Sequence, residues 1–524
     1  MKQTLDLKTL EGLDIELNEK FLESLSLMEN GSKNIFITGR AGTGKSTLLD
    51  CFRKITKKKI AVLAPTGVAA LNVNGQTIHS FFGFQPDITL SSVKYLPNQK
   101  MYGLIDAIII DEISMVRADL LDCIDKFLRF NGKDENKPFG GVQMIFIGDL
   151  YQLPPIVKGK ENEIFQTHYK SRYFFDSKIF DKISLEFIEL EKIYRQKDQK
   201  FIDLLNAVRN RSVTEEDIEE INKRVNSSFE PPKDDFYINL TTTNDLSNMI
   251  NEKELSKLDA KLFSFEGEIR GKFEKTSIPT EINLKIKIGS QVMLLNNDSS
   301  HRWVNGTIGK VIDIKKEKKE ELIVLELLNG DKVNVSKYTW DIYKLYYDAK
   351  KQSLDSDIIG SFTQYPLRLA WAVTIHKGQG KTFDKVIIDI GHGTFAHGQV
   401  YVALSRCTSL NGIVLKKPIR KDHIFMDWKI VDFLTKYQYK LSNKKFSLED
   451  KTELIKKAIK NKSKLNITYL KTNDTKTKRM ISPKRIDKME YQGKEYLGLE
   501  AYCHLRDDER VFRVDRILEI EEAK

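Results

Sequence analysis

The chain has 524 residues, of which 85 are Lys or Arg and 74 are Asp or Glu, so its net charge is +11. This basic balance favours a polyanionic partner. The chain is also broadly rich in Lys, Asn and Ile, so genomic composition bias is the alternative source of part of the positive charge. The length and the 40% apolar content predict three or more compact units, and the absence of any run of 18 apolar residues excludes a membrane-spanning helix.

The N-terminal segment and the cysteines exclude further classes. The first 20 residues lack an apolar core, so we expect no signal peptide and a cytoplasmic protein. The four cysteines, Cys51, Cys123, Cys407 and Cys503, lie far apart and form no C-x-x-C pair. This spacing argues against a disulfide framework and against a cysteine-ligated metal, and it fits a reducing compartment.

Residues 1–33 are predicted to form a polar lead-in followed by a helix. From residue 34 to about 190, short apolar runs alternate with helical patterns. Because strands that alternate with helices form parallel sheets, this region predicts an α/β fold. We expect its strands at residues 34–38, 60–64, 107–111, 143–148 and 186–190.

Residues 39–46 (GRAGTGKS) follow the first of these strands and precede a helical pattern. They match G-x-x-x-x-G-K-[ST], in which glycines let successive N–H groups point at a phosphate, beside a helix N-terminus. Lys45 is expected to reach the β- and γ-phosphates, and the Ser46 hydroxyl to hold Mg²⁺. A chance glycine-rich turn is the alternative, which the flanking strand and helix disfavour. The predicted nucleotide ligands are Gly39, Ala41, Gly42, Thr43, Gly44, Lys45, Ser46 and Thr47.

Two carboxylates end the strand expected at residues 107–111, at the sheet edge where ligands of parallel sheets bind. Asp111 is expected to hold Mg²⁺ through water, and Glu112 to act as the general base that activates the attacking water. The next strand leads into residues 148–155 (GDLYQLPP), where the Gln152 amide is placed to sense the γ-phosphate. A surface Asp-Glu pair and a plain turn are the respective alternatives.

The second half of the chain continues the alternation with an interruption. Residues 288–350 change to short apolar runs separated by Gly, Asn and Asp, which predict a small inserted β-barrel. Residues 371–377 (WAVTIHK) are expected to be helical, and residues 438–463 to be a Lys-rich helix with a linker. A last β-rich unit is predicted for residues 464–524. Further strands are expected near residues 236–241, 385–390 and 412–415.

Ten segments taken together resemble superfamily 1 DNA helicases, and the RecD/Pif-type branch in particular. Residues 116–129 (VRADLLDCIDKFLR) resemble the signature helix of the Pif-type branch. The resemblance covers about residues 34–430 and implies ATP-driven 5′-to-3′ translocation and DNA unwinding, a polarity that composition does not show. The segments are GRAGTGKS, APTGVAA (64–70), GQTIHSFF (75–82), DEIS (111–114), GDLYQLPP, EKIYRQ (191–196), LTTTN (240–244), VNGTIG (304–309), WAVTIHKGQGKTF (371–383) and VYVALSRC (400–407).

The same resemblance implies an architecture. Two RecA-like parallel-sheet domains would form a helicase core, the first from residues 34–195 and the second from residues 196–287 and 351–437. A small hairpin subdomain, which often serves as a wedge in this family, is implied for residues 83–103. An SH3-like domain is implied for the insertion at residues 288–350.

The resemblance also implies roles at the nucleotide. Arg195 and Arg406 would bind the γ-phosphate from two faces of a cleft, because the guanidinium fork and its permanent charge match phosphate oxygens. Arg406 is the expected arginine finger, and a solvated surface arginine is the alternative for either. Gln379 and Lys381 are expected to touch ATP. Residues 17–21 (LNEKF) lack the Gln that reads adenine in the family, so the use of other nucleoside triphosphates stays open.

The DNA track is expected to cross both lobes on the side away from ATP, where hydroxyls and backbone amides grip phosphates without reading sequence. Phe82 is expected to stack on bases. His79 and His376 are equally compatible with buried, hydrogen-bonded histidines. The candidates are Pro65, Thr66, Gly67, His79 and Phe82 on the first lobe, and Thr243, Asn244, Thr374, His376 and Lys377 on the second.

The C-terminal unit resembles a WYL domain through the segments ITY, ISP, EYL and RVFRVDRI, with Glu495 in place of the name-giving Trp. WYL domains are associated with the sensing of nucleic acids or nucleotide ligands. If residues 510–516 form a strand, Arg510 and Arg516 share one face and Arg513 points to the other. The wet face of a barrel strand is the alternative for these arginines. The candidate DNA contacts are Arg506, Arg510, Arg513 and Arg516.

We therefore expect a monomeric DNA helicase that depends on ATP and Mg²⁺ and acts on single-stranded and forked or structured DNA. Its WYL unit is expected to modulate single-strand binding. Two rivals stay open: a translocase that displaces bound protein without unwinding, and a single-strand-binding protein that uses ATP only as a structural ligand. The intact residues Lys45, Asp111, Glu112, Gln152 and Arg406 argue against the second rival.

Overall fold

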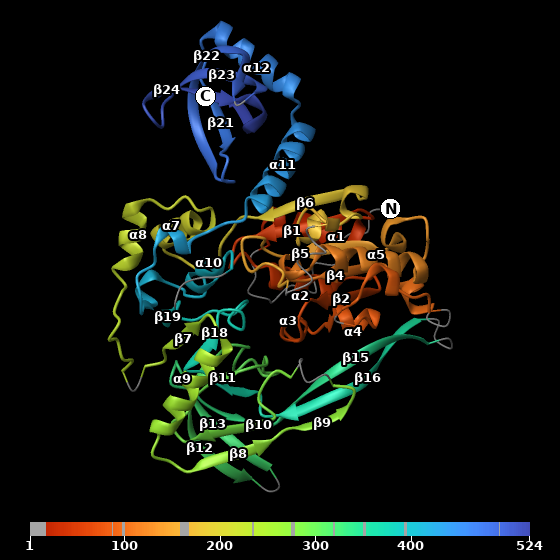
Figure 1. Ribbon diagram of the computed structural model, residues 1–524, viewed down its shortest axis with the longest axis vertical. Helices are drawn as coiled ribbons and strands as arrows, with labels where there is room; N and C mark the ends of the chain where they lie inside the picture. Colours follow the sequence, from red (N-terminus) through yellow and green to blue (C-terminus); the bar gives the residue numbers. More distant parts are fainter. Residues whose placement is uncertain are drawn as a thin grey trace. The chain divides into compact units, whose positions relative to one another are not determined.

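The structure is a computed structural model, and the chain divides into two compact units. The first comprises Met1–Val208 and Val213–Phe425, and the second comprises Arg209–Ser212 and Met426–Lys524. Figure 1 shows the element labels used below. The structure describes residues 17–85, 87–96, 100–157, 167–232, 235–273, 278–317, 320–348, 353–391, 396–491 and 493–523.

The first lobe is a six-stranded parallel sheet in the order β3-β2-β4-β5-β1-β6. All five strands expected in this region are present, and the two-residue β3 adds an edge. The central strands β4 and β5 are buried along their whole length, as expected for parallel strands covered on both faces. Their bounds are β1 Asn34–Gly39, β2 Ile60–Ala64, β3 Gln76–Thr77, β4 Ala107–Ile110, β5 Gln143–Ile147 and β6 Leu185–Leu190.

Helices bury the two faces of this sheet. Leu25 of α1 and Phe52 of α2 pack with Ile35 and Ile109 in one continuous core. Phe36, which points to the opposite face of β1, packs edge-on against Phe174. The helices are α1 Glu19–Asn30, α2 Lys45–Ile55, α3 Gly67–Asn72, α4 Ile78–Phe82 and α5 Ala118–Asn131, with 3-10 turns η4 Ile113–Met115, η5 Pro138–Gly141, η6 Phe174–Asp176 and η7 Phe180–Lys182.

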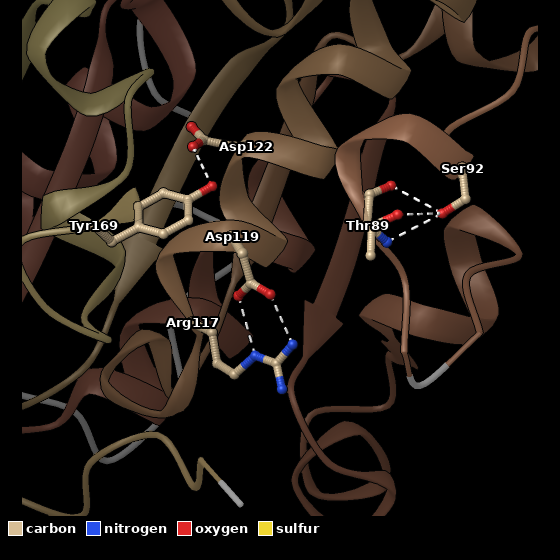
Figure 2. Close-up of polar contacts among 6 residues, drawn as sticks. All are labelled: Thr89, Ser92, Arg117, Asp119, Asp122 and Tyr169. Carbon is tan, nitrogen blue, oxygen red and sulfur yellow. Dashed lines mark hydrogen bonds and ion pairs between the residues drawn. The ribbon is translucent and has the colours of Figure 1, made fainter. Parts of the chain in front are cut away.

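The described part of residues 83–103 contains the 3-10 turns η2 Leu90–Ser92 and η3 Lys100–Leu104, and no strand. The predicted hairpin is therefore wrong for these residues. Thr89 and Ser92 close η2 by bonding each other's side chain and backbone (Figure 2). The turn is tied to α5, because Lys126 donates to the Leu90 carbonyl at 2.7 Å. Figure 2 also shows α5 anchored at its start by the Arg117–Asp119 ion pair.

The insertion is larger than predicted. A five-stranded antiparallel sheet, β14-β13-β12-β11-β17, encloses its own core, which includes Trp303 and Tyr365. The predicted boundary at residue 350 is wrong, because β15 and β16 pair along their length on either side of it. The SH3-like assignment stays a prediction. The strands are β8 Leu262–Glu266, β9 Glu268–Gly271, β10 Asn283–Lys287, β11 Gln291–Leu294, β12 Ile308–Glu317, β13 Glu320–Leu327, β14 Lys332–Val335, β15 Tyr338–Asp348, β16 Ser353–Gln364 and β17 Leu367–Leu369.

The second lobe is a four-stranded parallel sheet in the order β18-β7-β19-β20. The helix predicted for residues 371–377 is wrong. Ala372–Thr374 form the buried strand β18, because they pair in register with Asn239–Thr241 at the edge of the sheet. The elements are β7 Ile238–Thr241, β18, β19 Val386–Asp389, β20 Ile413–Leu415, α7 Gln199–Arg209, α8 Glu215–Asn222, α9 Asn244–Lys257, α10 Gln399–Leu404, η9 Leu410–Gly412 and η10 Lys421–His423.

The second unit is a five-stranded antiparallel sheet, β24-β23-β22-β21-β25, covered by α12. Residues 438–463, predicted as a helix with a linker, lie mostly in two helices separated at Ser447, whose side chain caps α12. Residues 510–516 do not form one strand, because the chain leaves one sheet edge after Arg513 and turns before pairing at the other edge. The elements are α11 Trp428–Lys445, α12 Leu448–Asn461, β21 Leu465–Leu470, β22 Lys476–Tyr491, β23 Lys494–Cys503, β24 Asp508–Arg513, η11 Val514–Arg516 and β25 Ile517–Glu522.

Candidate functional site

The phosphate loop joins β1 to α2 and depends on its glycines. Gly42 has φ +79° and Gly44 has φ +84°, values that L side chains rarely adopt. A Cβ at Gly42 would also lie 2.5 Å from the Cβ of Arg195, which packs directly over the loop. Thr43 is buried and donates its hydroxyl to the Arg40 carbonyl at 2.9 Å. The loop therefore has the shape that the sequence predicts for a phosphate cradle.

Lys45 begins α2 and lies under the loop. Its ammonium donates to the carbonyl oxygens of Gly39 at 2.8 Å and Arg40 at 3.0 Å. Burial lowers the pKa of Lys45, and the charges of Asp149, Glu112 and Asp111 oppose that shift. Three carboxylates thus surround one ammonium. Ser46 and Thr47, the next residues of α2, are exposed and half-buried respectively.

The two predicted carboxylates follow β4 directly. Asp111 is 9% exposed, and Glu112 has φ +51°, a left-handed conformation that is uncommon for a residue with a side chain. Burial raises the pKa of both carboxyls, and the charge of Asp111 raises that of Glu112 further. A carboxylate whose pKa lies nearer neutrality is better suited to accept a proton from water. The geometry thus fits Glu112 as a general base.

A glutamine of the second lobe joins this group. The Gln379 amide donates to Glu112 Oε2 at 3.0 Å and to Gln152 Oε1 at 3.2 Å. Gln152 itself donates to Asp149 Oδ2 at 3.2 Å, and Asp149 is fully buried. Gln152, which the sequence predicts to sense the γ-phosphate, is therefore hydrogen-bonded to Gln379 of the second lobe.

The two predicted arginines also meet at this place. Arg195 of the first lobe donates to the Ser405 carbonyl at 2.9 Å, next to Arg406 in the second lobe. Arg406 is 1% exposed and donates to the Val402 carbonyl at 2.9 Å and to the Ser405 hydroxyl at 2.9 Å. Burial lowers the pKa of Arg195, and the neighbouring charge of Arg406 adds to that effect. Two adjacent cations, Arg406 buried and Arg195 half-buried, therefore fit a highly charged anion.

Sequence reasoning missed Tyr401 at this junction. Its hydroxyl, from the buried helix α10, accepts a hydrogen bond from the Ala41 N–H of the phosphate loop at 2.9 Å. The signal was present, since Tyr401 lies five residues before Arg406 in the same motif. The contact shows that the second lobe reaches the loop itself as well as the carboxylates.

The residues fit a magnesium ion that is shared with the nucleotide. Asp111, Glu112 and Asp149 place more negative charge here than Lys45 alone offsets. Among the described residues no group of three or more His, Cys, Asp or Glu side chains forms a metal site by itself. Mg²⁺ is commonly held by one or two protein ligands, substrate phosphates and water, which suits Ser46 and Asp111.

The cap of α1 lies next to the phosphate loop through Tyr194. Asn18 caps this helix by accepting from the Phe21 N–H at 3.0 Å and donates to the Tyr194 hydroxyl at 3.0 Å. Tyr194 lies against Gly44, and its backbone N–H donates to Gly42. The donor and the acceptor of the Asn18 amide are thus both used within the protein.

Comparisons with known proteins agree with this geometry. The profile of the PIF1-like helicase family matches residues 16–219, and that of the WYL domain matches residues 450–522. The ATP-dependent DNA helicase Pif1 of Bdellovibrio bacteriovorus is 34% identical over 415 residues, which cover 77% of this chain and 88% of that protein. The chain belongs to the Pif1 helicase family.

Solved Pif1 structures support the assignment. Bacteroides Pif1 in complex with ADP-AlF4 has a TM-score of 0.74 and 37% identity, with coverage of 81% of this chain and 97% of that one. Bacteroides Pif1 bound to single-stranded DNA has a TM-score of 0.59 and 37% identity, with coverage of 80% and 96%. This chain is an ATP-dependent DNA helicase of the Pif1 family with a C-terminal WYL domain.

In this Pif1-family chain the first-lobe DNA candidates fall into two groups. Thr66, between Pro65 and Gly67, caps α3 by accepting from the Ala69 N–H at 3.2 Å. Phe82, in contrast, is 2% exposed and packs on Phe84 at a ring separation of 5.2 Å. The predicted stacking of Phe82 on bases is therefore wrong, because its ring belongs to an aromatic core. His79 lies on the same short helix, α4.

The second-lobe candidates lie at helix and strand ends. Thr243 caps α9, which begins at Asn244, and Thr374 ends β18 and accepts from the Lys377 N–H at 3.3 Å. Burial lowers the pKa of both His376 and Lys377. These side chains therefore lie in a partly desolvated part of the lobe.

Two residues of this lobe make interactions that the sequence did not predict. Lys381, whose expected contact with ATP stays a prediction, donates its ammonium to the Asn305 side-chain oxygen in the insertion. Arg368, which sequence reasoning missed, lowers the pKa of both Lys377 and Lys381 by its charge. It lay outside every quoted motif, so only the fold brings it to this place.

Two of the four arginines predicted to contact DNA in the WYL unit lie beside carboxylates. Arg513 pairs with Asp515 at 2.6 Å and lies over the Tyr496 ring, and Arg510 is 3.9 Å from Asp508. Arg516 lies in η11 and Arg506 in an exposed turn. The four arginines therefore do not form one basic row.

A buried arginine was missed in the same unit. Arg479 is 9% exposed and lies over the Phe512 ring at 5.6 Å, and it takes part in no ion pair within the described residues. Its Nη1 donates to Cys503 Sγ at 3.6 Å. Burial lowers the pKa of Lys471, and both Arg479 and Arg506 lower it further.

Proposed function

We propose that the chain translocates 5′-to-3′ along single-stranded DNA and unwinds duplex or structured DNA at the expense of Mg²⁺-ATP. The observation that carries the proposal is the Gln379 contact, because this second-lobe amide reaches both Glu112 and Gln152 of the first lobe. A site assembled from two lobes gains and loses its groups as the lobes move. Hydrolysis is thereby linked to a change in lobe separation, which is what translocation requires.

Each residue has a role that its surroundings favour. The phosphate loop and Lys45 bind the β- and γ-phosphates, and Ser46 and Asp111 hold Mg²⁺, whose charge neutralises the phosphate oxygens when it is bound. Glu112 accepts a proton from the attacking water. Gln152, Gln379, Arg195 and Arg406 surround the γ-phosphate, where the arginines stabilise charge as it develops.

The proposed DNA path uses capped helix starts and a cationic cluster. Thr66 and Thr243 begin helices in the two lobes, and such helix N-termini favour phosphate. Arg368, Lys377 and Lys381 form a cationic group around the end of β18, and the charge of Glu281 opposes the repulsion at Lys377 and Arg368. A strand phosphate at this group would relieve the repulsion among these cations.

The WYL unit is proposed to hold single-stranded DNA and so to modulate its release. The support is the cluster of Arg479, Lys471 and Arg506, where the charges that act on Lys471 are both cationic. Arg479→Ala in the full chain is expected to weaken single-strand binding and to reduce the salt slope by about 0.7 for each lost phosphate contact. Arg485→Ala is the control, because Arg485 is paired with Glu500 at 2.8 Å. An unchanged slope in Arg479→Ala would show that the cluster does not bind DNA.

One chain contributes every group named above, so we propose that a monomer is competent to hydrolyse ATP. Phosphate release measured with and without single-stranded DNA tests the proposal. DNA-stimulated release is expected, and release that DNA does not change would favour the rival in which ATP is only a structural ligand. Displacement of a bound protein without strand separation would favour the roadblock-clearing translocase.

Among the described residues no helix is long and apolar enough to cross a membrane.

A further inference from the structure

The segment that carries Gln379 makes contacts in two directions. Gln379 bonds Glu112 and Gln152 at the hydrolysis site. Two residues later, Lys381 donates its ammonium to the Asn305 side-chain oxygen in the insertion. A tight turn connects them, because the Lys381 N–H donates to the Gly378 carbonyl at 3.1 Å. Displacement of Lys381 therefore moves the backbone that carries the Gln379 amide.

Lys381 depends strongly on this one acceptor. It is 8% exposed, and burial, followed by the charge of Arg368, lowers its pKa to about 7. It takes part in no ion pair within the described residues. An ammonium that has left water and lies near another cation needs a hydrogen-bond acceptor, and the Asn305 carbonyl oxygen supplies it.

Asn305 is itself held from two sides. Its side-chain NH₂ donates to Asn72 Oδ1 at 2.9 Å, at the end of α3 in the first lobe. Its backbone N–H donates to Asn297 Oδ1 at 2.8 Å, within the insertion. The following residue, Gly306, has φ +102°, and a Cβ there would lie 3.5 Å from Cγ of Lys381. The turn is therefore fitted to the lysine stem.

These contacts join three parts of the molecule through one side chain. Asn72 ends the helix that Thr66 begins, and Thr66 is a proposed DNA contact. We propose that Asn305 is a positioning residue of the ATPase, which couples the insertion and α3 to Gln379 by holding Lys381. This inference rests on the proposed function, since it concerns how DNA engagement is communicated to hydrolysis.

The test compares Asn305→Ala with Asn305→Asp in the full chain. Alanine removes the oxygen that accepts from Lys381. Aspartate keeps this oxygen, and the Asn72 amide turns so that its NH₂ donates to the new carboxylate. Because Asn305→Ala removes a hydrogen bond to a charged group, its DNA-stimulated kcat should fall about tenfold. Its KM for ATP and its single-strand Kd should stay within about twofold of the values of the unmodified chain. Asn305→Asp should restore most of kcat. Asn329→Ala, an asparagine in the exposed β13–β14 turn, is the matched control and should be unchanged.

A double-mutant cycle tests whether the two side chains act through one interaction, and an unchanged single-strand Kd in Asn305→Ala shows that the variant is folded. Lys381→Met should lose as much kcat as Asn305→Ala, and the double variant should lose no more than either, because both changes remove one interaction. Additive losses of kcat at saturating DNA, a normal kcat in Asn305→Ala, or a parallel loss of single-strand affinity in Asn305→Ala would each overturn the inference. Failure of the unmodified chain to hydrolyse ATP with DNA would instead refute the proposed function.

Discussion

Removal of the Gln379 amide tests the junction between the lobes. In Gln379→Ala, Glu112 and Gln152 both lose a donor that lies 3.0 and 3.2 Å away. A hydrogen bond to a charged acceptor contributes about 1.5–3 kcal/mol, and one to a neutral acceptor contributes about 0.5–1.5 kcal/mol. If these bonds orient the base in the transition state, DNA-stimulated kcat should fall by about 10- to 100-fold, the factor given by the charged bond alone.

The assay is steady-state phosphate release at saturating ATP and saturating single-stranded DNA. Gln379→Glu should be worse than Gln379→Ala. Burial already raises the pKa of Glu112 to about 7, and a second carboxylate beside it raises this pKa above neutrality, where the carboxyl is protonated and cannot accept a proton. Gln199→Ala is the matched control, since Gln199 is exposed on α7 and its side chain donates to Asp203. A normal kcat in Gln379→Ala, or a raised KM with unchanged kcat, would refute the transition-state role.

Three further predictions concern single side chains. Glu112→Gln should still bind Mg²⁺-ATP but hydrolyse it about 10²–10⁴-fold more slowly, measured by single-turnover hydrolysis, and near-normal turnover would remove Glu112 as the base. Arg406→Ala should keep nucleotide affinity, measured by a fluorescent analogue, while losing DNA-stimulated hydrolysis; a weaker Kd with normal kcat would make it a ground-state ligand. Phe82→Ala should lower the free energy of unfolding by about 3–5 kcal/mol in urea, unlike Phe130→Ala on the exposed face of α5, and equal effects of the two would contradict the core assignment.

The strands of the first lobe were predictable because they are buried on both faces. Residues 107–110, for example, are four consecutive apolar residues that are fully buried. The phosphate loop and the DE pair followed from fixed spacing, since backbone geometry allows few alternatives at those positions. Residues 372–374 were misread as helix because three residues carry too little periodicity to separate a strand from a helix turn.

Contacts across large sequence distances were not predictable. Gln379 meets Glu112 across 267 positions, and Lys381 meets Asn305 across 76, so only the packed lobes bring them together. The motif alone does not show whether the Phe82 ring is buried, so the sequence predicted that it stacks on bases. Its ring is buried by neighbours such as Phe127, which lies 45 positions away.

Arg510 and Arg516 do not share the face of one strand, and the reason is topological. The pattern from Arg510 to Arg516 assumes one strand, but β24 pairs at one edge of the sheet and β25 at the other. The intervening residues must turn, and Val514 is buried there. Arg479 was missed because a single arginine in a strand carries no sign of burial.

Strand displacement on tailed duplexes tests the central claim most directly. With ATP and Mg²⁺, the full chain should unwind a duplex that carries a 5′ single-stranded tail and leave one with only a 3′ tail intact. Glu112→Gln, which keeps the folded site but lacks the base, should unwind neither. Unwinding of the 3′-tailed duplex alone, or equal unwinding by the chain and by Glu112→Gln, would contradict an ATP-driven 5′-to-3′ helicase.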